Sequence, residues 1–185
     1  VWGAQLEAGS YLTSYIPTYG STVTRNLEVC TNSGGSVEDF NGEEGVLFID
    51  VARFKNDLNY LTLRLAQNNS EANEVSFKFR NTEGLIFVRT TKDNATRGYI
   101  EYTFPPGEDD SFNKLAFAYQ ENSCSLWVNG QNVGNFSGPS SLAQDVLKYL
   151  QLARGLQEPF HGKVKNVQVF KRAMSDGELY LLTVP

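Results

Sequence analysis

The chain has 185 residues, which is enough for one full domain with a short appendage and for a sizeable hydrophobic core. Hydrophobic residues make up 41% and charged residues 20%, a globular composition unlike that of a disordered chain or a membrane protein, and no apolar run reaches the roughly 18 residues that span a bilayer. The formal charge of −5 argues against a surface that neutralises nucleic-acid phosphates.

The first part of the chain differs in character from the remainder. Residues 1–25 combine several glycines and Pro17 with Tyr15 and Tyr19, and they show neither helical nor sustained strand periodicity. We predict that residues 1–25 are an extended connector, or the last strand of a preceding domain, and that they pack against a neighbour. Because the chain lacks an initiating methionine and a charged-then-apolar leader, we expect it to be a fragment whose main domain covers residues 26–185.

From Gly45 onward, short runs of alternating apolar and polar residues are separated by polar, glycine-containing turns. In one such run Val75, Phe77 and Phe79 face one side of a strand and the polar residues between them face the other. The predicted strands are 45–51, 60–65, 75–80, 85–90, 98–104, 114–119, 123–128, 150–153 and 162–170. This pattern is typical of an all-β fold, an antiparallel β-sandwich.

Two local signals are sharper than the alternation. Asn129 and Gly130 follow an alternating run and favour a hairpin with a type I′ turn, because both residues tolerate a positive φ. Ser175 is followed three residues later by Glu178, which predicts a capping box at the start of one short C-terminal helix.

Three segments of this domain resemble a known family. Residues 112–119, 126–131 (Leu-Trp-Val-Asn-Gly-Gln) and 160–179 (ending Arg-Ala-Met-Ser-Asp-Gly-Glu-Leu) match, in order and spacing, the motifs of laminin-G-like, concanavalin A-like jelly-roll domains. The resemblance covers about residues 30–185. It implies a concanavalin A-like jelly roll with one short C-terminal helix.

A second, shorter resemblance concerns the start of the chain. The string from Trp2 to Ser10 (Trp-Gly-Ala-Gln-Leu-Glu-Ala-Gly-Ser) is similar to a segment that recurs in bacteriophage tail and other virion proteins, where it closes one β-sandwich and leads into a laminin-G-like one. This resemblance implies a virion surface protein, located outside the cell.

Few side chains are available for catalysis. With one His and two Cys, zinc sites and Ser/His or Cys/His triads are disfavoured, so an enzyme would have to use carboxylates. Glycosidases need two carboxylates that face each other, but the motif Glu-x-Asp-x-x-Glu is absent and the acidic clusters lie in turn-like contexts. His161 lies where the family tolerates any residue. We therefore predict a non-enzymatic protein.

Calcium is the candidate cofactor, because rim loops of a sandwich can gather carboxylate and carbonyl oxygens and laminin-G-like domains often bind the ion there. The candidate metal ligands are Asp93, Asp109 and Asp110, with ordinary turn charges as the alternative. A bridge between Cys30 and Cys124 and a pair of buried thiols explain the two cysteines equally well.

Glycan recognition combines aromatic faces with amide and guanidinium groups. The candidate ligand-binding residues are Trp127, Tyr99, Tyr102, Arg97 and Asn94, and sheet packing is the alternative for each aromatic ring. In the segment 126–128, Trp127 is predicted to lie on the outer surface of a sheet or under a loop, while Leu126 and Val128 face the space between the sheets.

These observations predict a carbohydrate-binding adhesion module of a phage tail fibre or other virion surface protein. The expected partners are a host-surface glycan and other virion subunits, including further copies of this chain in a trimer, without nucleic acid and without membrane insertion. The alternatives are a structural virion domain, for decoration or assembly, and a polysaccharide-degrading enzyme.

Overall fold

The computed structural model describes residues 15, 17, 19–23, 33–54, 61–80, 82, 84–154, 158–160 and 162–185. The predicted connector is thus described at only a few positions, so the predicted domain boundary after residue 25 stays a prediction. The string from Trp2 to Ser10, Cys30 and His161 lie outside the described residues.

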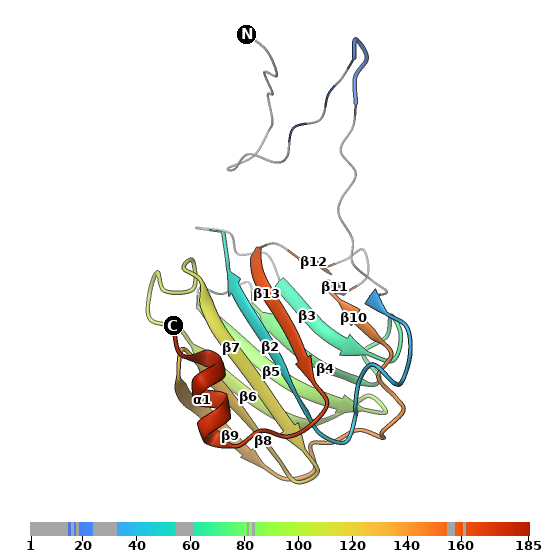
Figure 1. Cartoon of the computed structure of the whole chain (residues 1–185), viewed down its shortest axis with the longest axis vertical. Coiled ribbons are helices and arrows are strands. Elements are labelled where there is room, and N and C mark those ends of the chain that lie inside the picture. Colours follow the sequence, from blue (N-terminus) through green and yellow to red (C-terminus); the bar gives the residue numbers. More distant parts are fainter. Residues whose placement is uncertain are drawn as a thin grey trace.

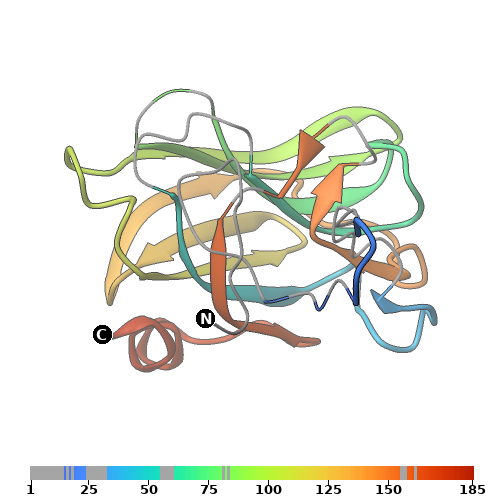
Figure 2. The same cartoon turned by 90° about the horizontal axis from the view of Figure 1, so that it is seen from above.

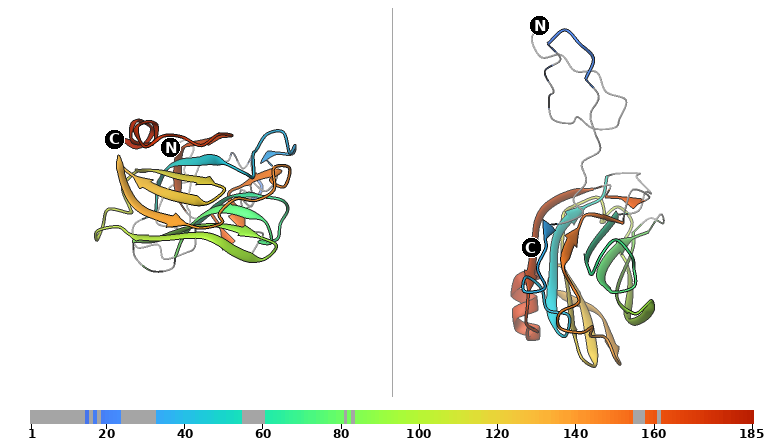
Figure 3. Two further views of the ribbon diagram at one scale, coloured as in Figure 1. Left: turned by 90° about the horizontal axis from the view of Figure 1, so that it is seen from below. Right: turned by 90° about the vertical axis from the view of Figure 1, so that its right-hand side faces the viewer.

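Two antiparallel sheets face each other, as the predicted sandwich requires (Figures 1 and 3). The six-stranded sheet has the order β1 (Ser33–Gly34), β10 (Tyr149–Gln151), β3 (Leu61–Ala66), β4 (Glu74–Phe79), β5 (Leu85–Lys92), β6 (Ala95–Thr103). The five-stranded sheet has the order β13 (Lys163–Phe170), β2 (Gly45–Ala52), β7 (Asn113–Gln120), β8 (Ser123–Val128), β9 (Gln131–Ser137). A small ribbon joins β11 (Ala153–Arg154) to β12 (Glu158–Pro159).

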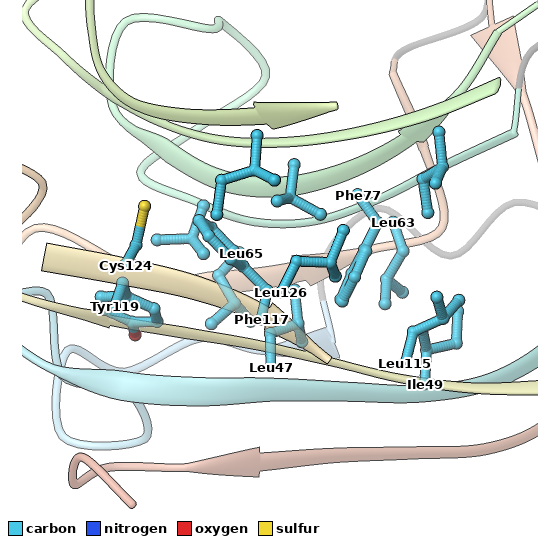
Figure 4. Close-up of a cluster of buried hydrophobic side chains, with 14 of the residues drawn as sticks. Leu47, Ile49, Leu63, Leu65, Phe77, Leu115, Phe117, Tyr119, Cys124 and Leu126 are labelled. Carbon is cyan, nitrogen blue, oxygen red and sulfur yellow. The ribbon is translucent and has the colours of Figure 1, made fainter. Parts of the chain in front are cut away.

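The core lies between the two sheets because alternate residues of each strand are apolar. Leu63 and Phe77 of the six-stranded sheet point toward Leu47, Phe117 and other residues of the five-stranded sheet (Figure 4). Fully burying one such side chain stabilises a fold by about 1.5–3 kcal/mol, so this layer is the main source of stability. The predicted all-β architecture is confirmed, and strands appear within a few residues of the predicted ranges.

A second apolar layer lies on the outside of the five-stranded sheet. The C-terminal helix α1 (Asp176–Thr183) packs across this face, and Leu179 is buried with Phe48 and Trp127 beneath it (Figures 1 and 3). The predicted capping box is present, since the Ser175 and Glu178 side chains each accept from the other's backbone N–H.

Two of the hairpins have tight turns formed by residues with positive φ. Asn129 and Gly130 both have positive φ, 49° and 80°, as the predicted type I′ turn between β8 and β9 requires. A second turn of this kind joins β5 to β6 at Asp93 and Asn94, with φ of 53° and 66°. This second turn was not predicted from the sequence, where Asp93 and Asn94 were named only as candidate site residues.

The two sheets leave different outer faces. In the view from above, the strands of the six-stranded sheet lie on the side opposite α1 (Figure 2). Among the described residues α1 is the single helix, and it covers the five-stranded sheet. The outer face of the six-stranded sheet therefore has no helix over it within the described part of the chain.

Candidate functional site

The outer face of the six-stranded sheet carries polar and charged side chains in a row across five strands. The register aligns Gln151 with Arg64, Arg64 with Ser76, Ser76 with Arg89, and Arg89 with Tyr99. Residues opposite each other in antiparallel strands point to the same side of a sheet. We call this row, with Glu74 and Lys78 of β4 and Phe87 and Glu101 of the next row, the polar face.

An ion pair anchors the polar face. Arg64 Nη1 lies 2.9 Å from Glu74 Oε2, and both side chains are 0% exposed. Arg64 Nη1 also donates to the Ser70 carbonyl at 3.0 Å, and Nη2 donates to the Asn69 carbonyl at 3.2 Å. Ser76 donates its hydroxyl to the other oxygen of Glu74 at 3.1 Å. Arg64 and Glu74 thus build a rigid, hydrogen-bonded floor.

Arg89 extends this network toward solvent, and Lys78, whose side chain is only 6% exposed, joins it from β4. Arg89 donates to Glu74 Oε1 from Nε and Nη2, at 3.0 and 2.8 Å, and its side chain is 19% exposed. Lys78 Nζ lies 3.2 Å from the same oxygen. Burial raises the pKa of Glu74, but the charges of Lys78 and Arg89 and the hydrogen bonds from Arg89 and Arg64 outweigh burial, so the pKa lies below its usual value.

The loop between β3 and β4 lies against one part of the polar face. From this loop Glu71 pairs with Lys78 and, at 2.9 Å, with Arg89 Nη2. The loop is itself fixed to the β5–β6 turn, because the Asn94 N–H donates to the Ala72 carbonyl at 3.0 Å. The loop and the turn together form the rim of the polar face.

An aromatic pair completes the polar face on its β6 side. Tyr99 and Phe87 have ring centroids 5.6 Å apart, and the guanidinium of Arg80 lies 4.5 Å from the centre of the Phe87 ring. The Tyr99 hydroxyl donates to the Glu101 carboxylate. Tyr99 is 36% exposed, so part of its ring is open to a ligand.

The structure brings three of the five predicted ligand-binding residues to this face or its rim. Tyr99 belongs to the polar face, Arg97 is exposed two residues before it on β6, and Asn94 is exposed in the rim turn. Glycine at position 98 between them is the inward residue, because a Cβ there would lie 2.7 Å from Cys124 Sγ. Tyr99, opposite Arg89, lies on the outer side of β6, and the exposed Arg97 falls where the register between β5 and β6 shifts.

The other two predicted ligand-binding residues lie elsewhere. Tyr102 points toward the core and packs edge-on against Phe104, with centroids 5.0 Å apart. Trp127 lies on the outer surface of β8 as predicted, but α1 covers it and leaves it 7% exposed. Since a sugar needs an open ring face, we assign Tyr102 and Trp127 to packing.

The predicted metal ligands are not gathered. Asp109 is buried and paired with Arg53 at 3.3 Å, and it accepts from the Gly84 N–H at the start of β5. Asp93 lies at the other end of that strand, roughly 25 Å away at about 3.3 Å per residue, so it cannot share an ion with Asp109 and Asp110. Among the described residues no three His, Cys, Asp or Glu side chains form a metal-binding group.

The charged centre of the polar face, namely Arg64, Glu74, Lys78 and Arg89, was not predicted from the sequence. Their positions in the alternating pattern indicated the outward side of each strand, but outward charges are ordinarily solvated. A usable signal was available: three neighbouring strands each place charged residues at outward positions. Cross-strand register, which the sequence does not state, was needed to align them.

A separate pocket of about 920 Å³ lies away from the polar face. Its lining includes Glu43, Glu44 and Glu121 with several amides and hydroxyls, and no aromatic ring is among its described lining residues. Without an aromatic surface, the pocket is a poorer match to a sugar ring than the polar face is.

Comparisons with known proteins agree with this architecture. Residues 53–179 match the family model described as the Concanavalin A-like lectin/glucanases superfamily. No curated protein sequence matches the chain significantly. No helix among the described residues has the length and apolar character needed to cross a membrane.

Several solved structures share the fold. The CBM40 of the Ruminococcus gnavus IT-sialidase aligns with a TM-score of 0.64 and 15% identity over 86% of this chain and 96% of that one, and it has also been solved bound to alpha2,3 sialyllactose. The leech intramolecular trans-sialidase aligns with a TM-score of 0.60 and 16% identity over 85% of this chain and 26% of that one.

A heptameric SAP-like pentraxin from Limulus polyphemus aligns with a TM-score of 0.61 and 10% identity over 86% of this chain and 76% of that one. Identities this low show a common fold and nothing further about ligands. The family match covers most of the chain and agrees with the two facing sheets, so the chain belongs to the Concanavalin A-like lectin/glucanases superfamily.

Proposed function

We propose that this chain is a non-catalytic carbohydrate-binding module whose polar face binds a glycan with an acidic sugar. The observation that carries the proposal is the alignment of Arg89 with the partly exposed ring of Tyr99 on neighbouring strands. Arg97 adds a second exposed guanidinium next to Tyr99.

The tyrosine ring and the guanidinium groups are complementary to the apolar C–H surface and the carboxylate of an acidic sugar. The ring of Tyr99 offers an apolar surface for the C–H groups of a pyranose, and guanidinium groups bind carboxylates through charge-assisted, planar hydrogen bonds. The three cations Arg64, Lys78 and Arg89 outnumber the carboxylates Glu71 and Glu74, so the network has a positive balance within an acidic chain. A module of the same fold has been solved with sialyllactose, so that sugar is a suitable first acidic ligand to test.

The two carboxylates at the polar face, Glu71 and Glu74, are in a state that suits ligand binding better than glycoside hydrolysis. A general acid in a glycosidase needs a raised pKa, whereas the pKa of Glu74 is lowered by Lys78 and Arg89 despite its burial. Glu71 is likewise ion-paired with Lys78 and Arg89. An enzyme would release reducing sugar from a polysaccharide panel, and a single carboxylate substitution would abolish that release.

Binding of 3′-sialyllactose, with lactose as the neutral control, tests the proposal by isothermal titration calorimetry. The chain should bind sialyllactose more tightly, and Arg97→Ala should weaken that binding without changing the melting temperature. Absence of binding to both sugars would contradict the proposal. Repeating the titration with calcium and with a chelator tests the remaining expectation of a calcium-dependent site.

For the biological setting we propose the surface of a virion, such as a phage tail fibre, and thus an extracellular location. The supporting observation is the string from Trp2 to Ser10, with its resemblance to virion proteins. The exposed side chains of Tyr15, Tyr19 and Val23 offer apolar contacts to other subunits, including copies of this chain in a trimer. Light scattering that shows a strict monomer at high concentration would contradict the assembly role.

A further inference from the structure

The two glutamates of the polar-face network are held in different ways. Glu74 is fully buried on β4 and is fixed by Arg64, Lys78, Arg89 and the hydroxyl of Ser76. Glu71 comes from the β3–β4 loop, is 27% exposed, and contacts the network from its solvent side. Glu74 is thus part of the floor, whereas the Glu71 carboxylate lies on top of it.

The Glu71 carboxylate lies against Lys78 and Arg89, whose side chains are 6% and 19% exposed. It pairs with Lys78 Nζ and with Arg89 Nη2 at 2.9 Å, while Arg64 below them is fully buried. A sugar carboxylate would use the same donors once the Glu71 side chain moves away, because Glu71 is the more exposed partner of both cations. The side chain and the ligand therefore compete for one position.

From this geometry we infer that Glu71 is a built-in competitor whose carboxylate occupies the Lys78–Arg89 pair until the carboxylate of an acidic sugar displaces it. This inference rests on the proposed function and deepens it, since it names Glu71 as a residue that sets the affinity and the charge specificity of the polar face. Neutral sugars do not compete with Glu71, because they offer no carboxylate to the two cations.

Displacement requires only a side-chain rotation. The backbone on both sides of Glu71 is anchored, with the Ser70 carbonyl accepting from Arg64 at 3.0 Å and the Ala72 carbonyl accepting from the Asn94 N–H at 3.0 Å. The exchange leaves neither cation unpaired and preserves charge, because the sugar carboxylate takes the place of the Glu71 carboxylate.

The test compares Glu71→Gln with Glu121→Gln, which removes one charge from the exposed β7–β8 turn, outside the polar face. Titration calorimetry with 3′-sialyllactose and with lactose is performed on both variants and on the unaltered chain, and melting temperatures are recorded. We expect Glu71→Gln to bind 3′-sialyllactose about three- to tenfold more tightly, because removing a competing state raises the binding-competent fraction. Lactose affinity and the Glu121→Gln variant should remain unchanged.

Each outcome decides the inference. Tighter binding of 3′-sialyllactose by Glu71→Gln, or binding by this variant alone, supports it. If the unaltered chain binds 3′-sialyllactose and Glu71→Gln binds it equally or more weakly, the competitor role is wrong while the proposed function stands. If no variant binds 3′-sialyllactose, both fail together. If Glu71→Gln has a lower melting temperature than the unaltered chain, the titrations are repeated with Glu71→Ala, which also removes the carboxylate.

Discussion

Arg64 and Glu74 form a 2.9 Å ion pair that is fully shielded from solvent, although both side chains point away from the hydrophobic core. The shielding has a local cause, because the β3–β4 loop places the carbonyls of Asn69 and Ser70 on the guanidinium of Arg64. The outer face of a sheet thereby acquires a buried, low-dielectric centre. This centre holds the more exposed Arg89 in one orientation.

Removing one partner of this pair should destabilise the fold. We expect Arg64→Met to lower the free energy of unfolding by about 3–5 kcal/mol, because it breaks a fully buried ion pair. Urea denaturation followed by circular dichroism measures the change. Arg172→Met, which removes an exposed pair with Glu178, is the control and should shift the midpoint much less. Equal shifts for the two variants would contradict a buried, structural role for Arg64.

The contribution of the Tyr99 ring to sugar affinity should be separable from that of the Tyr99 hydroxyl. Tyr99→Ala should reduce affinity for 3′-sialyllactose by roughly fivefold, since stacking of a sugar on an aromatic ring is worth on the order of 1 kcal/mol. Tyr99→Phe should retain most of the affinity because the ring remains. Tyr180→Ala removes a comparably exposed ring from α1, on the other sheet, and should leave binding unchanged. Full affinity in Tyr99→Ala would exclude this ring from the site.

The helix cap should make stability depend on pH in a defined window. Hydrogen bonds from Arg172, then from the backbone and side chain of Ser175, lower the pKa of Glu178 from 4.5 to about 2. A carboxyl whose pKa is lower in the folded state than in the unfolded state stabilises the folded state when it is ionised. This contribution is therefore fully present above pH 4.5, the pKa in the unfolded state, and is lost as the pH falls toward 2. Melting temperatures of the unaltered chain and Glu178→Gln should differ at pH 6 and converge near pH 2. A difference that persists at pH 2 would contradict this assignment.

The thiol of Cys124 should be unreactive in the folded protein. Cys124 is buried, and burial raises its pKa to about 12, so little thiolate exists at neutral pH. In a Cys30→Ser background, iodoacetamide at pH 8 should modify Cys124 only after denaturant is added, as measured by intact mass. Stoichiometric modification of the native protein would contradict the packing around this thiol. The intact mass of the unaltered chain before and after reduction reports whether Cys30 and Cys124 are bridged.

The close approach of the two sheets at Gly98 should not tolerate a side chain. A Cβ at this position would lie 2.7 Å from Cys124 Sγ and 3.0 Å from Ser140 Cβ. Gly98→Ala should therefore cost about 1–3 kcal/mol of stability through overpacking, measured by urea denaturation. Gly177→Ala is the control, because the space around Gly177 in α1 is open and alanine favours a helix. An unchanged midpoint for Gly98→Ala would show that the sheets can separate there.

The sequence by itself determined the architecture, because its signals are local. Alternation of Val75, Phe77 and Phe79 with polar residues identified a strand with one apolar face, and the same pattern elsewhere predicted the sandwich. The capping box at Ser175 and the turn at Asn129 were also readable, since each depends on residues within a few positions of one another. Tyr99 and Arg97 were identified as candidates from their types alone.

Only the tertiary structure decided how the site is assembled. Alternation places Arg64, Glu74 and Arg89 on the outward side of their strands, but the register between strands decides that they meet, and register depends on the packing of the whole core. The same holds for Trp127, whose outward face is buried because a helix from the end of the chain lies over it. Contacts between residues distant in sequence decided which side chains form the polar face and which serve packing.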